Sequence, residues 1–406
     1  MPHLDDSRNA RKVDRGPVES GCPVEQGPDG VWRVRGHAAG RAVLRSTDTV
    51  QAGLGVETMD KLPARIRRPV LYRDGPEHRE HRRQTARYFT QRRVDERYRE
   101  LMEQVADEQL RRLVREGSAD LGELSFRLAV EVTAAVIGLT ESRPGLDARL
   151  ERFFPEKFGK PGFRSPSGLY WFYRQNRSFL SIYLNDVRPA VRARRAGRRD
   201  DLISHLMDEG CRGGEILGEC VTFAAAGMVT TREFINMAVW HLFGDADLKA
   251  RYLAGDRDER YAVLHEILRL EPVVGNLKRR TVGAVEVPGP DGPVVIPAGD
   301  LVDVDVSATN LDTAAFGERP LEVCPARPFG DGASASGLSF GDGAHRCPGA
   351  HLAIQESDVF LTRLFALEGL AMDAPPRISM KEEISGYELR GLIITVPAPA
   401  RELTSP

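Results

Sequence analysis

One cysteine, Cys347, stands in a setting that suits metal binding. It lies in the run FGDGAHRCPG, residues 340–349, and an amphipathic helical pattern follows directly. At a helix N-terminus the dipole and the free backbone N–H groups favour a thiolate, the form of cysteine that binds metals. Pro348 suits the first helical turn because its missing N–H is not needed there. This spacing predicts a reactive or metal-binding thiolate.

The residues around this cysteine indicate a flat, bulky ligand. Gly341, Gly343 and Gly349 let the backbone bend tightly and approach such a ligand, while Phe340 offers an aromatic face. His345 adds a hydrogen-bonding group of the kind that ligand carboxylates require. A planar metal macrocycle fits this description.

Two other interpretations of the loop are weaker. One is an ordinary glycine-rich loop with a buried cysteine. The other is a zinc site built from Cys324, His345, Cys347 and His351, but that spacing matches no common zinc arrangement.

The loop resembles the haem-binding loop of the cytochrome P-450 family, FGxGxHxCxG, and every fixed position of that motif is present. The resemblance implies haem b, protoporphyrin IX iron, with Cys347 as the axial thiolate ligand of the iron. It also implies that His345 contacts a haem propionate and that Phe340, Gly341 and Gly349 form the cofactor-binding loop. The expected fold is mainly α with small β-sheets, a triangular prism of helices around a buried haem.

A second match is the pair Glu266 and Arg269, three residues apart on one face of an expected helix. Alone, such a pair would be a surface salt bridge worth at most about 1 kcal/mol. It matches the family motif ExxR, however, and Arg327 in CPARPF stands where the third member of a buried structural triad is expected.

Four further residues are candidates for contact with the haem propionates. His78 and Arg82 share one helical face and resemble the family's HxxxR pair. In NLKRRTV either Arg279 or Arg280 would reach a propionate, and we prefer Arg280. Without the resemblance, the segment around His78 would read as a solvated basic helix.

The segment from Glu215 to Phe243 is apolar nearly all round at its centre, AAAGMVTT, as expected for a helix across the core. It resembles the family motif AGx(D/E)T(T/S). The resemblance assigns Ala226 and Gly227 to an oxygen-binding groove, and Thr230 and Thr231 to the catalytic positions.

Val229 stands where that motif has an acid, and a valine cannot relay protons. Three explanations stay open. Water held by Thr230 and Thr231 delivers protons, Glu233 substitutes one turn further on, or the chemistry depends less on proton delivery, as in oxidative coupling.

The family selects substrates through the loop before His78, the region 153–173, the middle of the long helix, the turn after Arg269 and a late strand turn. The aromatic run LYWFY, residues 169–173, could stack on a substrate, although such runs are more often core packing. These segments predict an apolar pocket. Its candidate residues are Leu54, Val56, Met59, Leu62, Phe223, Ala226, Val273, Val274, Asn276, Leu277, Leu392 and Ile393.

The elements that must position these residues are mostly helical. Apolar periodicity predicts helices at about 37–44, 77–88, 93–116, 119–138, 170–195, 214–243, 258–270 and 348–368. Strand-like runs are VWRVRG near residue 30 and, late in the chain, KRRTVGAVEV, PVVIPAG, LVDVDVS and LIITVP, with PGPDG as a hairpin turn. Residues 1–20 are expected to be a disordered arm, and residues 21–406 a single catalytic domain.

The composition bounds the partners. A formal net charge of −2 gives no reason to expect nucleic acid or a membrane surface. The five cysteines contain no CxxC pair, which argues against a disulfide framework. No segment resembles a signal peptide or a membrane span, so a cytoplasmic location is expected.

The predicted function is monooxygenation of a small, secondary-metabolite-like organic molecule by O₂. Because no length is left for a reductase module, electrons from NAD(P)H are expected through ferredoxin reductase and ferredoxin. One alternative keeps the haem but performs oxidative coupling, desaturation or peroxide-driven chemistry, and its support is Val229. Another is a non-catalytic haem sensor or carrier, against which Thr230 and the Ala226–Gly227 pair argue.

Overall fold

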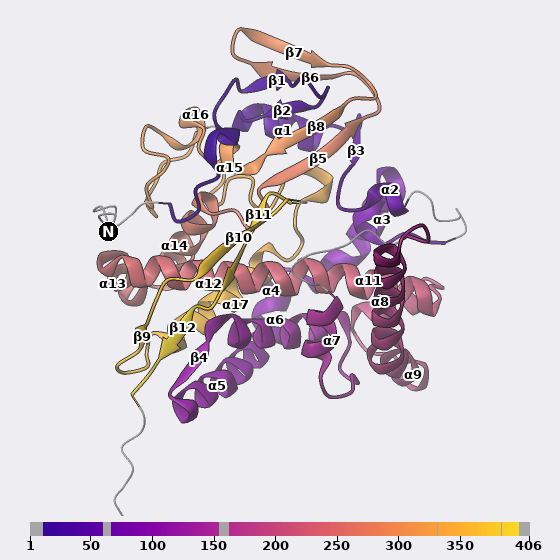
Figure 1. Cartoon of the computed structure of the whole chain (residues 1–406), viewed down its shortest axis with the longest axis vertical. Coiled ribbons are helices and arrows are strands. Elements are labelled where there is room, and N and C mark those ends of the chain that lie inside the picture. The colour runs from indigo at the N-terminus through magenta and orange to yellow at the C-terminus, as the bar shows by residue number, and fades with distance from the viewer. Residues whose placement is uncertain (1–10, 60–65, 154–161, 331, 383, 398–406) are drawn as a thin grey trace, which may run out of the picture.

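The computed structural model describes residues 11–59, 66–153, 162–330, 332–382 and 384–397. Helices dominate, the largest sheet lies at the top of Figure 1, and a smaller three-stranded sheet lies at the lower left. The expectation of a mainly helical fold with small β-sheets is confirmed. The α-helices are α1 His37–Arg45, α2 Val56–Met59, α3 Gly75–Thr85, α4 Gln91–Arg93, α5 Arg99–Glu116, α6 Leu121–Ile137, α7 Leu146–Phe153, α8 Pro166–Ile182, α9 Arg188–Ala196, α10 Leu202–Asp208, α11 Gly213–Ala224, α12 Thr230–Gly244, α13 Ala246–Ala254, α14 Arg257–Leu270, α15 Val306–Thr309, α16 Thr313–Phe316 and α17 Ala350–Leu364.

Short segments of tighter or wider helix join several of these. Three are π-helical, and each continues a longer helix. The π segment η6, Ala225–Val229, connects α11 to α12, so these two lie in one line across the molecule (Figure 1). The others are the 3₁₀ turns η1 Gly16–Glu19, η2 Val70–Tyr72, η3 Ala86–Tyr88 and η7 Gly343–His345, and the π segments η4 Val94–Tyr98 and η5 Tyr183–Val187.

The largest sheet has the strand order β1-β2-β8-β5-β3, in which β2 and β8 run parallel and the other neighbours antiparallel. The remaining sheets are a β6-β7 hairpin, a β10-β11 hairpin and the order β4-β12-β9. The strands are β1 Val24–Gln26, β2 Trp32–Val34, β3 Thr49–Gln51, β4 Ser118–Asp120, β5 Asn276–Thr281, β6 Val285–Gly289, β7 Gly292–Ile296, β8 Leu301–Asp305, β9 Ala371–Met372, β10 Arg377–Lys381, β11 Gly386–Arg390 and β12 Ile393–Thr395.

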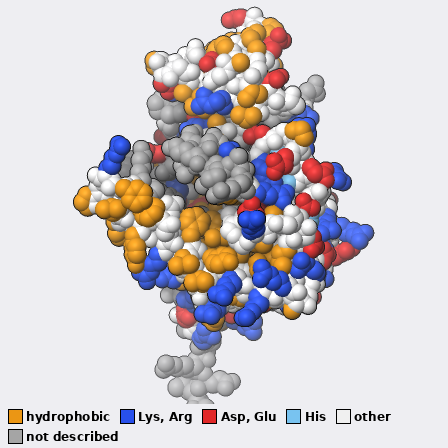
Figure 2. Space-filling view, turned by 90° about the vertical axis from the view of Figure 1, so that its right-hand side faces the viewer, with side chains coloured by type: hydrophobic (Ala, Val, Ile, Leu, Met, Phe, Trp, Pro, Cys, Tyr) orange, Lys and Arg blue, Asp and Glu red, His pale blue; other side chains and the backbone are white. Residues whose placement is uncertain are grey.

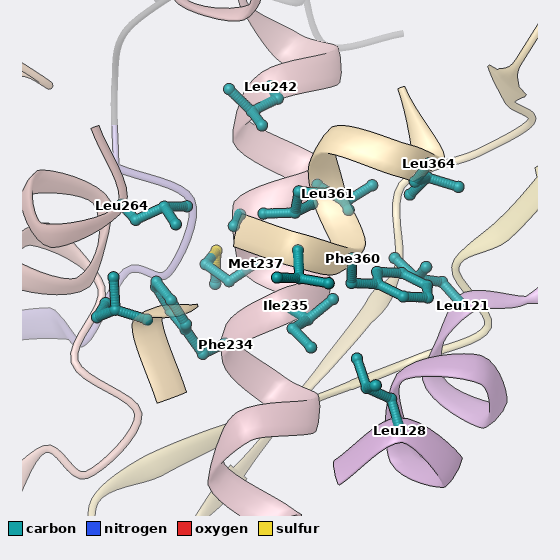
Figure 3. Close-up of a cluster of buried hydrophobic side chains, with 14 of the residues drawn as sticks. Leu121, Leu128, Phe234, Ile235, Met237, Leu242, Leu264, Phe360, Leu361 and Leu364 are labelled. Atoms are coloured by element: carbon teal, nitrogen blue, oxygen red, sulfur yellow. The ribbon is translucent and has the colours of Figure 1, made fainter. Parts of the chain in front are cut away.

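The main core forms where α12, α17, α14 and α6 meet. Figure 3 shows Met237 and Ile235 of α12 beside Phe360 and Leu361 of α17, with Leu128 of α6 facing them. All are buried, as an apolar helix through the centre of a domain requires. This packing fixes two elements next to the candidate site. α12 carries Thr230 and Thr231, and α17 follows the cysteine loop.

The amino-terminal segment differs from the prediction. Residues 11–20 were expected to belong to a disordered arm, yet Val13 is only 1% exposed and joins the main core, and η1 follows it. Residues 1–10 lie outside the described part of the chain. The sequence argument failed because this segment is held by one buried apolar side chain, Val13, and by polar contacts to residues distant in the sequence.

Candidate functional site

The cysteine loop is a tight turn that presents Cys347 shortly before α17. Gly341 and Gly343 have φ values of +67° and +65°, where a side chain would be strained. A Cβ on Gly343 would also lie 2.2 Å from the carbonyl oxygen of Leu44, so only glycine fits there. The backbone N–H of Cys347 donates to Phe340 O at 2.8 Å and closes the turn. Pro348 precedes the helix instead of opening it, since α17 begins at Ala350.

The thiol of Cys347 remains accessible in this structure. The residue is exposed, yet protein surrounds it closely enough for burial to raise the pKa of the thiol above its usual value. The backbone N–H of Gly349 and the nearby Arg82 and Arg346 lower the pKa by less. The expected stabilisation of a thiolate by the helix terminus is therefore outweighed by desolvation. A bound cation would reverse this balance, because it favours the deprotonated ligand.

The π segment η6 has an accessible side, and the next candidate residues lie there. Ala226 is exposed although its neighbours Ala224 and Met228 are buried in the core. The hydroxyl of Thr230 donates to Ala226 O at 2.6 Å, a return bond that a widened helical turn accommodates. Thr231 is buried. Thr230 and Ala226 are thus brought together at accessible space, and Thr231 is not.

Gly227 packs against α6 and does not lie on the accessible side of η6. A Cβ at this position would lie 2.8 Å from the hydroxyl oxygen of Thr133 on α6. Glycine is therefore needed for close approach of η6 to α6. The expected role of Gly227 in the oxygen groove has no geometric support.

His78, Arg82 and His345 gather beside the cysteine loop. The rings of His78 and His345 stack with centroids 4.1 Å apart, and Arg82 donates to the carbonyl oxygen of Arg346. Burial, and secondarily His345, lowers the pKa of His78 to about 4. The Nδ1 atom of His78 is buried without a hydrogen-bond partner among the described residues. A buried polar atom of this kind is one that a ligand carboxylate would satisfy.

The strand register favours Arg279 over Arg280, against the preference from the sequence. Arg279 is buried, and its guanidinium donates to Gln51 Oε1 at 2.7 Å. Burial lowers its pKa to about 10, while Asp74 opposes that effect. Asp74 also lies 2.9 Å from Nε2 of His345, so Arg279 points toward the cysteine-loop side. Arg280 is exposed on the other face of β5 and donates to Gly299 O.

The predicted structural triad is assembled and buried. Both Nε and Nη2 of Arg269 donate to Glu266 at 2.8 Å, and Nε of Arg327 donates to the same carboxylate at 2.9 Å. Arg269 also donates to Asn310 O, and Asn310 accepts from the N–H of Leu338 near the cysteine loop. Buried charges of this kind hold position because each is paired.

Glu233 is not free to replace the acid that Val229 lacks. Its carboxylate is fully buried and accepts from Arg232 at 2.9 Å, from the N–H of Leu389 at 2.8 Å and from Arg390 at 2.7 Å. These bonds tie α12 to β11. The hypothesis of Glu233 as a proton donor therefore loses its support.

The residues predicted to line the substrate pocket lie in different parts of the structure. Leu392 is buried in the main core, and Ile393 pairs with Asp120 in the β4-β12 sheet, so the place of both in a substrate pocket stays a prediction. The turn that approaches the segment after α14 is the one between β10 and β11, where Gly275 N donates to Ile384 O.

The other candidates for the substrate pocket differ in their contacts and burial. Phe223 stacks on Phe89 with centroids 5.8 Å apart, and Val56 lines a cavity of about 490 Å³ together with Tyr72 and Arg73. Leu54 is exposed, and Leu62 lies outside the described residues. The remaining candidates are buried or half-buried: Met59, Val273, Val274, Asn276 and Leu277.

The aromatic run on α8 is neither core nor pocket lining in the described part of the chain. Tyr170 and Tyr173 are 59% and 63% exposed, and Leu169 is exposed beside them. Figure 2 shows apolar side chains gathered on this side of the molecule, the side on which Figure 1 places α8.

Sequence reasoning missed Asp74 and Gln51. Asp74 accepts from Gln51 N at 3.0 Å and contacts His345, and Gln51 holds Arg279. The signal available was Asp74 at the N-cap position before Gly75 and Pro76. Gln51 gives no sequence signal, because its role depends on the pairing of β3 with β5.

Groups of histidine, cysteine and carboxylate residues that could hold a bare metal ion are absent from the described residues. The accessible thiol, the unpartnered Nδ1 of His78 and the inward Arg279 fit a planar iron cofactor with carboxylate groups. None of the described helices has the length and apolar character that crossing a membrane would demand.

Comparison with known proteins agrees with this geometry. The family model described as cytochrome P450 matches residues 261–381. Cytochrome P450 107B1 of Saccharopolyspora erythraea is 30% identical over 321 residues, 76% of this chain and 72% of that protein. The erythromycin C-12 hydroxylase of the same organism is 29% identical and covers 86% of this chain and 84% of its own. A solved structure of a P450 EryK mutant with erythromycin B aligns with a TM-score of 0.73 and 25% identity, covering 96% of both chains.

Proposed function

This chain belongs to the cytochrome P450 family and is a monooxygenase of that family, and we propose that it inserts one oxygen atom from O₂ into a small secondary-metabolite-like molecule. The observation that carries this proposal is the thiol of Cys347, which is accessible although protein surrounds it closely. Its relatives include a hydroxylase named for erythromycin. Haem b would be the cofactor, with electrons from NAD(P)H through ferredoxin reductase and ferredoxin.

One residue would hold the iron of the haem, and three others would bind its propionates. Cys347 would hold the haem iron through its sulfur, and haem bound there would supply O₂ activation and redox chemistry. His78, His345 and Arg279 would bind the propionates, because all three are buried or half-buried next to the loop. Asp74 would orient His345 through their 2.9 Å contact.

Thr230 would hold a proton near the reacting atoms. Its hydroxyl now donates to Ala226 O and could instead donate toward the accessible side of η6 by rotating about χ1. Since Val229 has no ionisable group and Glu233 is engaged, protons would have to arrive through water near Thr230.

The first test is a spectrum of the purified, reduced protein with carbon monoxide, recorded beside the Cys347→Ser variant. We expect a strongly red-shifted Soret band in the wild type and its loss in the variant, because a thiolate ligand produces that shift. A folded protein that takes up no haem when supplied with it would overturn the proposal.

A second candidate is oxidative coupling, desaturation or peroxide-driven chemistry, which Val229 favours. Val229→Asp restores the acid beside Thr230 and should change the fraction of consumed electrons that appears in product. Val229→Ala is the matched control, because it adds no proton donor. Identical coupling and rate in all three proteins would show that position 229 takes no part in proton delivery.

A further inference from the structure

The segment of residues 11–15 is anchored at the end of α14. The backbone N–H groups of Lys12 and Val13 both point to Oε1 of Glu271, the residue that follows α14. Glu271 is fully buried, and its Oε1 also lies 3.3 Å from Nε2 of His241 on α12. Val13 fills a place in the core. The segment is therefore held by both polar and apolar contacts.

Arg15 bridges two turns that are far apart in the sequence. Its Nη2 donates to Pro272 O at 2.6 Å, and its Nη1 donates to Ser385 O. Pro272 begins the turn between α14 and β5, and Ser385 ends the turn between β10 and β11. The guanidinium also lies over the Tyr387 ring, 6.0 Å from its centre. One side chain thus binds both turns at once.

The two turns are fitted closely to each other at this point. A Cβ on Gly275 would lie 2.1 Å from Ser385 O and 2.2 Å from Nη1 of Arg15. A Cβ on Gly386 would lie 2.3 Å from Val273 O. Two glycines face each other's backbone here, so the separation of the turns is set within a fraction of an ångström.

The bridged turns lead directly to the candidate site. The turn after α14 continues into β5, where Leu277 lies 3.6 Å from the Cβ position of Gly341 in the cysteine loop. The same strand carries Arg279. A displacement of this turn would move residues 273–277, four of which are candidates for lining the substrate pocket.

We propose that Arg15 is a positioning residue for substrate selection, which holds the turn after α14 against the β10-β11 turn and so sets the width of the substrate site. The effect on substrate selection rests on the proposed function. The clamp itself rests on Arg15 and the two carbonyl oxygens.

The test uses Arg15→Ala and Arg15→Lys in the holoenzyme, with Arg33→Ala as control. Lysine keeps the charge but lacks the fork that binds two acceptors. Arg33 pairs with Asp29 at 2.8 Å on β2, away from both turns. The probes are imidazole and 4-phenylimidazole, whose dissociation constants are read from the shift of the Soret band.

Imidazole is small, whereas 4-phenylimidazole must fit between the walls of the site. We expect the ratio of the two dissociation constants to change by about tenfold in Arg15→Ala, as expected for losing charged hydrogen bonds that fix a wall. Arg15→Lys should fall between, and Arg33→Ala should match the wild type. A ratio equal to that of the wild type in both Arg15 variants would overturn the inference.

A second readout needs no haem. Trypsin cleaves after Lys381, which ends β10 at the clamped turn. Cleavage there should be several times faster in Arg15→Ala, because the turn would open more often. If the protein takes up no haem, the proposed function fails while this experiment still reports on the clamp. Unchanged cleavage at Lys381 would show that Arg15 does not hold the turn.

Discussion

Burial, more than formal charge, governs the ionisable side chains near the candidate site. Cys347 lies close to two arginines, yet desolvation still raises the pKa of its thiol. Arg279 faces Asp74, yet burial lowers its pKa to about 10. Each group would regain charge stabilisation from a ligand of opposite charge. The charged forms of these two side chains would therefore be more stable with a ligand bound than without one.

The positions of Arg279 and Arg280 lead to a matched pair of variants. Arg279→Gln should weaken haem retention by about tenfold or more, because a buried charged hydrogen bond to a propionate contributes about 1.5–3 kcal/mol. Arg280→Gln should leave it nearly unchanged, since that side chain is exposed. Transfer of haem to apomyoglobin measures the dissociation rate. Faster loss from Arg280→Gln than from Arg279→Gln would reverse our assignment.

His81 gives a pH prediction with a definite sign. Its ring is 1% exposed, and burial together with Arg73, Arg67 and His205 lowers its pKa to about 3 from a normal 6.5. Between these values the unfolded chain binds a proton that the folded chain does not. Stability attributable to His81 is complete above pH 6.5 and is lost as the pH falls, by up to roughly 1.4 kcal/mol per pH unit.

The His81 effect can be isolated with a substitution. Urea unfolding of His81→Phe between pH 6.5 and pH 4.5 should show a shallower loss of stability than the wild type. His351→Gln, at a half-buried histidine, is the comparison. Equal slopes for the wild type and His81→Phe would mean that His81 is protonated in the folded protein.

At the scale of elements, the structural triad links α14 to the loop that precedes the cysteine turn. Glu266→Gln would leave Arg269 and Arg327 buried without their carboxylate. We expect a loss of about 3–5 kcal/mol in the free energy of unfolding. Glu259→Gln, which removes an exposed salt bridge with Arg251 from the same helix, should cost no more than about 1 kcal/mol. Comparable losses in chemical denaturation would contradict a special role for the triad.

The long helices could be predicted from the sequence because each buries a periodic apolar face. α6, α14 and the line of α11 and α12 lie within a few residues of their predicted bounds. The β6-β7 hairpin was also expected, and its last pair is Gly289 with Gly292, around the predicted PGPDG turn. The β10-β11 hairpin was missed although Ile378 and Met380 alternate with polar residues, because this run is only five residues long and its apolar side chains are exposed instead of packed in a core.

Other parts of the site depend on contacts that no local pattern contains. Arg279 and Arg280 are adjacent, and only pairing with β3 and β8 determines which one faces inward. The anchoring of residues 11–15 depends on Glu271 and Ser385, distant in sequence. Motif residues such as Cys347 and Glu266 were recognisable because their chemistry requires a fixed spacing. Their supporting partners, Asp74 and Gln51, were not.

At the scale of the whole molecule, one face carries exposed arginines close to the cysteine loop. Arg79 of α3 and Arg87 of η3 are exposed, and α3 contacts the loop through Arg82. Figure 2 shows basic side chains, with acidic ones among them, on this side, where Figure 1 places α3. The net charge of the chain is only −2, so this local cationic region would dominate the approach of an acidic electron donor.

Reduction by a plant-type [2Fe–2S] ferredoxin and its reductase should therefore slow as ionic strength rises. Salt at about 0.15 M shortens the Debye length to about 8 Å and screens exposed charges. Arg79→Glu should lower the second-order rate of reduction by about tenfold at low salt and flatten its salt dependence, because steering acts on association. Arg33→Glu, on β2, should leave both unchanged. If Arg33→Glu slows reduction as much as Arg79→Glu, the total charge would govern association, and if neither does, the donor docks elsewhere.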